Sequence, residues 1–128
     1  MISSSEKTQI DEVLELVGLS HAKNIKMKKY SLGMKQRLAI ALALISDPEL
    51  LVLDEPVNGL DPNGMMEIRE LLKKLNKEKG VTIFISSHLL QEIDKMVTHL
   101  GIISHGEIKF EGSKEKLNEL FKFQRTKF

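Results

Sequence analysis

Two adjacent carboxylates, Asp54 and Glu55, follow directly on four apolar residues at positions 50–53, and a turn-rich stretch comes after them. A strand can be apolar along its whole length when both of its faces are covered, as in a parallel sheet between helices. Open α/β sheets bind ligands at the carboxyl ends of such strands. There, Asp54 is suited to hold Mg²⁺, and Glu55 to polarise an attacking water. The same pattern also describes an ordinary strand that ends in solvated acids.

A histidine follows the next apolar, β-branched stretch, residues 81–86. The residues between the two stretches carry a helical stripe and end at Gly80. Strand, helix and strand in this order indicate a crossover unit with parallel strands. We therefore expect His88 at the same sheet edge as Asp54 and Glu55, although a histidine at such a place can also be purely structural.

One of two predicted helix starts is a candidate anion site. Ser31 and Gly33 precede the Ala- and Leu-rich residues 38–45, which predict a helix that is buried all round. Unpaired N–H groups and the helix dipole favour an anion at such a start, and glycine allows close approach. The alternative is that Ser31 only caps the helix. Asp61 before Pro62 likewise has the pattern of an N-cap followed by proline.

The remaining elements follow from periodicity and turn residues. Residues 1–8 are polar and expected to be loose, and Thr8 with Asp11 resembles a capping box at the start of a helix that Gly18 ends. A further helix is expected over residues 89–100. A hairpin follows around His105 and Gly106, and then a C-terminal helix with basic residues. The predicted hairpin strands are residues 100–104 and 107–111, and the predicted tail is residues 113–128.

Composition excludes several classes of protein. The 128 residues carry 19 basic and 18 acidic side chains, a net charge of +1, so electrostatics give no reason to expect a nucleic-acid partner. No cysteine is present, which rules out disulfides and thiolate metal sites. The apolar runs are far shorter than the roughly 20 residues that a spanning helix needs. No signal-peptide pattern is recognisable at the start, and these features predict a soluble cytoplasmic chain.

Four motifs in order resemble the C-terminal half of an ATP-binding-cassette (ABC) transporter's nucleotide-binding subunit. Residues 30–37 (Tyr-Ser-Leu-Gly-Met-Lys-Gln-Arg) are similar to the family signature. Residues 50–55 match the Walker B strand with its catalytic glutamate, residues 58–61 (Asn-Gly-Leu-Asp) the D-loop, and residues 86–88 the switch histidine. The variant signature is similar to those of bacterial drug and antimicrobial-peptide exporters of the bacitracin or lantibiotic type.

The resemblance implies an α/β fold, namely part of a P-loop-NTPase-like ABC cassette with parallel strands, flanking helices and part of the helical subdomain. It divides this single partial domain into a helical subdomain at 9–48, a core at 49–112 and a tail at 113–128. No Gly-x-x-x-x-Gly-Lys-Ser/Thr sequence occurs in the chain, so the phosphate-loop half of a cassette is missing from it.

The resemblance also implies ATP and Mg²⁺ as cofactors and assigns roles to three residues of one site. Asp54 would help position Mg²⁺, Glu55 would act as base toward the attacking water, and His88 would contact the γ-phosphate. Phosphoryl transfer leaves little covalent work to the protein, so positioning and charge stabilisation would be the mechanism.

Further residues would serve the opposite subunit, because this family places two ATPs between two cassettes. Ser31 and Gly33 would complete the partner's site, and Asp61 would cross the same interface. The implied partners are therefore a second nucleotide-binding subunit, identical or different, and a transmembrane permease that holds the protein at the cytoplasmic face of the membrane.

Two positions depart from the family signature, because Leu32 replaces its first glycine and Met34 its glutamine.

Without a phosphate loop, the chain is expected not to hydrolyse ATP by itself. In the family the phosphate-loop strand lies beside the histidine-bearing strand, so residues 81–86 are expected to leave a free edge and to promote self-association. The alternatives are a soluble ABC-type ATPase of DNA repair or translation, and a non-catalytic module that pairs with an intact cassette.

Overall fold

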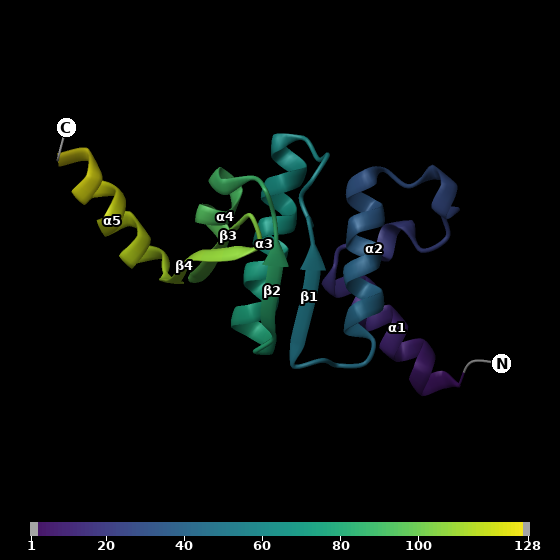
Figure 1. The fold of residues 1–128 in the computed structure, drawn as a ribbon. Coiled ribbons are helices and arrows are strands. Elements are labelled where there is room, and N and C mark those ends of the chain that lie inside the picture. Colours follow the sequence, from purple (N-terminus) through teal and green to yellow (C-terminus); the bar gives the residue numbers. More distant parts are fainter. Residues whose placement is uncertain (1–2, 127–128) are drawn as a thin grey trace. The chain divides into compact units, whose positions relative to one another are not determined.

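The computed structural model describes the backbone of residues 3–126 and the side chains of residues 3–122. It divides into two compact units, Met1–His88 and Leu89–Phe128, each described by itself below. The first contains α1 (Ser4–Leu16), two short 3₁₀ helices η1 (Ser20–Ala22) and η2 (Met27–Lys29), α2 (Leu32–Leu44), β1 (Leu50–Asp54), α3 (Pro62–Lys79) and β2 (Thr82–Ser86) (Figure 1).

Helix α1 begins earlier than the sequence pattern predicts. Ser3 is its N-cap and forms a reciprocal capping box, because Ser3 Oγ accepts from Glu6 N and Ser3 N donates to a carboxylate oxygen of Glu6. Thr8, the predicted cap, lies inside the helix and donates its hydroxyl to Ser4 O. The expectation of a loose start is therefore wrong for residues 4–8, because Ser-x-x-Glu satisfies two terminal N–H groups at once. Residues 1–2 lie outside the described part.

The second helix, α2, is buried on one side only. Ile40, Ala41 and Leu44 are buried, whereas Leu42 is 62% exposed. The prediction that this helix is covered all round is wrong within the described residues, because their other elements pack against one side of it. An apolar helix sequence predicts that the helix surface is buried. It does not identify the segment of the protein that packs against that surface.

The predicted crossover is confirmed. Strands β1 and β2 pair in parallel, with Asp54 opposite Ser86, and α3 connects them. Asp61 caps α3, Pro62 is its first residue, and Gly80 ends it with a φ of +67° that suits glycine. The predicted stripe of α3 is buried: Ile68, Leu71, Leu72 and Leu75.

The small parallel sheet has one covered and one open face. Leu51 of β1 is 2% exposed, but Val52 and Phe84 are each 64% exposed. The prediction that β1 is covered on both faces is therefore wrong within the residues that the structure describes. The sheet order is β1-β2, so in that part of the chain β2 has a single strand neighbour.

The second unit contains α4 (Leu90–Met96), β3 (His99–Ser104), β4 (Glu107–Ser113) and α5 (Lys114–Thr126). The hairpin is confirmed, with antiparallel pairing and a register irregularity at Ile102 and Ile103. The predicted helix over residues 89–100 is wrong at its end, because Val97 is extended and the chain enters β3.

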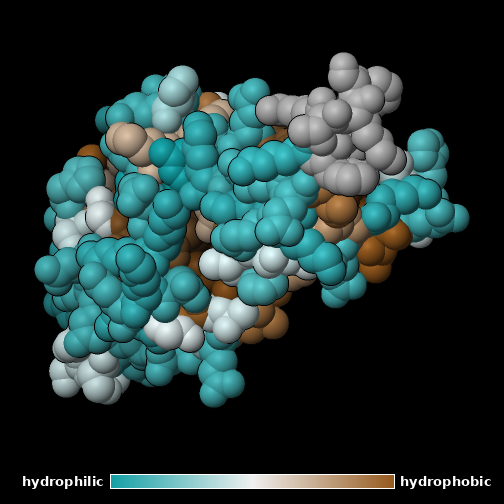
Figure 2. Space-filling view, turned by 90° about the vertical axis from the view of Figure 1, so that its left-hand side faces the viewer, coloured by the Kyte–Doolittle hydropathy of each residue, from teal (hydrophilic) through white to brown (hydrophobic). Residues whose placement is uncertain are grey.

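The C-terminal helix is also confirmed, up to Thr126, while residues 127–128 lie outside the described part. Leu117 of this helix is buried, whereas Leu120 and Phe121 are exposed. The face of the molecule drawn in Figure 2 is mostly hydrophilic, with hydrophobic side chains visible between polar ones.

Candidate functional site

The carboxyl ends of β1 and β2 bring the predicted acids and the histidine together. The strands run parallel and in register, so both end at the same edge of the sheet (Figure 1). The backbone continues this pairing one residue further, because Glu55 N donates to Ser86 O at 2.9 Å. The geometric prediction for Asp54, Glu55 and His88 is therefore met, and Ser86 joins them. We call these four residues the acid–imidazole cluster.

Glu55 and His88 are joined by two contacts within the cluster. Glu55 Oε1 accepts hydrogen bonds from His88 N at 3.1 Å and from His88 Nδ1 at 2.8 Å. An ionised carboxylate can only accept, so Nδ1 carries the proton in this pair and Nε2 is left for another group. His88 is 65% exposed and Glu55 is 30% exposed, which leaves the pair open to a ligand from outside.

The other oxygen of Glu55 has no such partner. Among the described side chains, Glu55 Oε2 is a buried polar atom without a hydrogen bond. Glu55 also has a φ of +50°, which is uncommon and strained for a residue of this type. Strained backbone and unsatisfied buried oxygens concentrate at functional sites, because the surrounding structure must hold them in place.

The carboxylate of Asp54 points to a different partner. Ser86 Oγ donates to Asp54 Oδ1, so a carboxylate and a hydroxyl lie side by side. Hard oxygen donors of this kind suit Mg²⁺, which usually binds one or two carboxylates together with substrate phosphates and water. No group of three or more His, Cys, Asp or Glu able to hold a metal occurs among the described residues.

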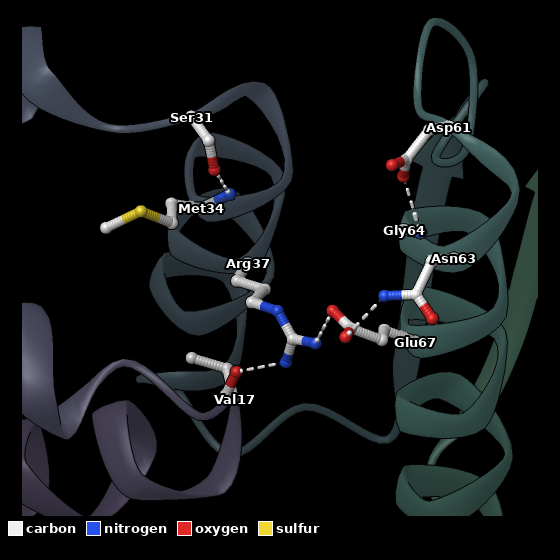
Figure 3. Close-up of polar contacts among 8 residues, drawn as sticks. All are labelled: Val17, Ser31, Met34, Arg37, Asp61, Asn63, Gly64 and Glu67. Carbon is white, nitrogen blue, oxygen red and sulfur yellow. Dashed lines mark hydrogen bonds and ion pairs between the residues drawn. The ribbon is translucent and has the colours of Figure 1, made fainter.

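The other three predicted site residues lie at two helix starts. Ser31 caps α2, with Oγ accepting from Met34 N at 3.2 Å, and Asp61 caps α3, with Oδ1 accepting from Gly64 N at 2.8 Å (Figure 3). Gly33 lies in the first turn of α2. Figure 1 shows that both helices start at the end of this unit toward which β1 and β2 point.

Sequence reasoning missed several residues of this region. Ser86 could have been found from strand register, because a parallel pair places it opposite Asp54. Arg37 and Glu67, which form an ion pair at 3.1 Å between α2 and α3, left no signal of their own. A cavity of this unit, about 580 Å³, is lined by Gln9, Leu44, Val81 and their neighbours rather than by the site residues.

Comparison with known proteins decides the family. A family model described as "AAA domain, putative AbiEii toxin, Type IV TA system" matches residues 2–94, well over half of the chain. A solved structure, cbiO1 from Clostridium perfringens, described as part of the ABC transporter complex cbiONQ, superimposes with a TM-score of 0.86 at 31% identity. That match covers 98% of this chain and 51% of the other. The chain belongs to the AAA-domain family, and its fold is that of an ABC cassette.

Curated relatives of this chain include ATP-binding proteins named for bacitracin and lantibiotic transport. The bacitracin transport ATP-binding protein BcrA of Bacillus licheniformis is 52% identical over 97% of this chain and 42% of its own length. The lantibiotic transport ATP-binding protein SrtF of Streptococcus pyogenes is 47% identical over 97% of this chain and 55% of its own. The chain thus spans about half the length of the curated relatives it matches. The predicted α/β ABC cassette fold is confirmed.

Proposed function

We propose that this chain forms the C-terminal part of the ATP-hydrolysing subunit of an ABC transporter that exports a drug or an antimicrobial peptide. The relatives named for bacitracin and lantibiotic transport support this substrate class. The catalytic role is supported by the state of Glu55. Its backbone is strained, its carboxylate contacts His88, and its second carboxylate oxygen is buried without a hydrogen bond.

In this proposal, ATP binds with its γ-phosphate toward the acid–imidazole cluster. Glu55 would accept a proton from the attacking water through its carboxylate. His88 donates Nδ1–H to Glu55 and so holds the carboxylate, and a ring protonated on both nitrogens would donate Nε2–H to a phosphate oxygen. Asp54, with Ser86, would hold Mg²⁺, which when bound neutralises the charge that gathers on the phosphates.

The two helix starts would serve a second subunit. Ser31, Gly33 and Asp61 lie on N-termini whose dipoles favour a phosphate supplied from outside this chain. The proposed partners are therefore a second nucleotide-binding subunit and a membrane permease, which would keep the protein at the cytoplasmic membrane surface. Within residues 3–126, no helix is both long and apolar enough to cross a membrane.

Reconstitution of a split cassette tests the proposal. The chain is produced together with the half of BcrA from Bacillus licheniformis that precedes the matched region, and the release of inorganic phosphate from ATP and Mg²⁺ is measured. We expect phosphate release from the combined halves and none above background from this chain alone. Turnover by the chain alone, or none from a combined preparation that binds ATP, would contradict the proposal.

A further inference from the structure

The side chain of Arg37 connects three elements of the first unit. Its Nη1 donates to Val17 O at 2.6 Å, at the carboxyl end of α1, and its Nη2 donates to Glu67 Oε2 at 3.1 Å, on α3 (Figure 3). Arg37 itself lies on α2, and its side chain is only 20% exposed. The planar guanidinium offers several donors in a fixed geometry, so one side chain can bind two acceptors on different elements at once.

Glu67, whose carboxylate accepts the hydrogen bond from Arg37, is also bound by a second residue. Asn63 Nδ2 donates to Glu67 Oε1 at 3.2 Å, one helical turn earlier on α3. Each oxygen of Glu67 therefore has a named partner, and Asn63 stands two residues after the Asp61 cap. This arrangement extends the link from Arg37 to the first turn of α3.

The chain also leaves room for the guanidinium at Gly18. A Cβ added at this glycine would lie 3.1 Å from Arg37 Nη1, and Gly18 has a φ of +79°. Both the space and the backbone conformation therefore favour glycine beside Arg37.

A second contact joins the two helix starts. A Cβ built at Gly59 would lie 3.1 Å from Leu32 Cδ2, and one built at Gly33 would lie 3.9 Å from Leu60 Cδ2. Leu32 is the residue that replaces a glycine of the family signature. In this chain its side chain reaches the turn at residues 58–61, so the substitution adds an apolar contact that glycine could not make.

We infer that Arg37 is a positioning residue, which with Glu67 fixes the turn at residues 31–34 relative to the turn at residues 58–61. The Arg37–Glu67 ion pair holds α2 against α3, and the contact of Leu32 with the turn at residues 58–61 sets the distance between the starts of the two helices. This inference rests on the proposed function, because the two turns are held together in order to meet the same nucleotide of a partner subunit. Among the described residues, Arg37 bonds to Val17 and Glu67 rather than to Ser31 or Asp61, so its action is indirect.

A distance measurement on the chain tests the link. The protein has no cysteine, so spin labels at Lys35→Cys and Lys73→Cys, exposed positions of α2 and α3, report the distance between the helices without further changes. Glu67→Gln removes the charge but keeps an oxygen and the size of the side chain. We expect this variant and Arg37→Gln to broaden the distance distribution clearly, with Arg37→Lys in between.

Lys23→Gln is the matched control, because it removes one charge from an exposed ion pair of the same unit, Lys23 with Asp11 at 3.3 Å. It should leave the distribution unchanged. Circular dichroism checks that each variant folds, and should Arg37→Gln unfold, Glu67→Gln decides, since Glu67 is 49% exposed. An unchanged distribution in Glu67→Gln, or equal broadening in Lys23→Gln, would overturn the inference.

A nucleotide measurement separates this inference from the proposed function. In the reconstituted cassette, Glu67→Gln should raise the ATP concentration for half-maximal turnover about threefold, the range expected from loss of one partly exposed ion pair, and leave the maximal rate nearly unchanged. A changed maximal rate with unchanged half-saturation would contradict a positioning role. Absence of any turnover in the unmodified cassette would refute the proposed function instead, and the distance distribution would still decide the link.

Discussion

Glu55 and His88 stand 33 residues apart in the chain and meet through a 2.8 Å contact between Oε1 and Nδ1. The contact exists because β1 and β2 run parallel and end in register, and because Glu55 leaves its strand in a left-handed backbone conformation. A regular extended residue at position 55 would continue the alternation of the strand and face away from position 54. The strain at Glu55 therefore directs its carboxylate toward the histidine.

Replacing the histidine should separate its role in catalysis from its role in stability. His88→Ala removes a hydrogen-bond donor to Glu55 from a site that is 65% exposed. We expect turnover of the reconstituted cassette to fall about a hundredfold, the lower range for a group that assists proton transfer. The free energy of unfolding should change by less than about 1 kcal/mol, as for other exposed pairs. His105→Ala in the hairpin turn is the control, and a loss of turnover there would contradict a specific role for His88.

Relieving the strain at Glu55 should stabilise the chain and abolish turnover by the reconstituted cassette. Glu55→Gly suits the φ of +50° and removes the unpaired buried oxygen, so we expect the free energy of unfolding to rise by about 0.5 to 1 kcal/mol. Asp47→Gly, at a φ of +52°, should gain less, because aspartate tolerates this conformation better than glutamate. Urea denaturation measures both, and destabilisation by Glu55→Gly of more than about 1 kcal/mol would show that the strain argument is wrong.

The cap at Ser31 gives a way to separate helix stability from ligand binding. Ser31→Ala removes the acceptor for Met34 N and should cost about 1 kcal/mol, whereas Ser31→Gly should cost only a few tenths. Both variants lose the hydroxyl, so a phosphate-binding role predicts that both raise the ATP concentration for half-maximal turnover alike. Urea denaturation and ATP titration give the two quantities. If the ATP requirement follows helix stability instead, Ser31 acts only as a cap.

The open face of the β1–β2 sheet predicts self-association. Phe84 and Val52 are each 64% exposed, and β2 has a single strand neighbour among the described residues. We expect light scattering to detect dimers or larger species at high protein concentration, and Phe84→Lys to reduce them. Met27→Lys, at another exposed apolar residue of the same unit, is the control. A clean monomer at high concentration would contradict this prediction.

Local rules predicted the order of elements well, and non-local features poorly. The crossover from β1 to β2, the Asp61 cap and the Gly80 stop follow from spacing and from turn residues, which act within a few positions. Local sequence patterns did not predict which side of α2 or β1 is buried. Leu42 and Val52 belong to apolar runs, yet both are exposed, because burial depends on which other segment packs against them.

The candidate site shows the same division. Motif spacing predicted that Asp54, Glu55 and His88 share a sheet edge, since parallel strands place their ends together. The contact of Asp54 with Ser86 required the strand register, and the left-handed φ of Glu55 required the folded backbone, since glutamate has no local preference for it. Arg37 and Glu67 are 30 residues apart, and no local pattern connects them.

Phosphate release by the reconstituted cassette with Glu55→Gln is the most direct measurement of the catalytic role. The amide keeps the size of the side chain and can still accept a hydrogen bond from His88, but it cannot take a proton from water. We predict that turnover falls at least a hundredfold while binding of ATP is retained, and that Glu49→Gln, just before β1, leaves turnover unchanged. Turnover by Glu55→Gln within a few fold of the unmodified chain would contradict the assignment of Glu55 as the base.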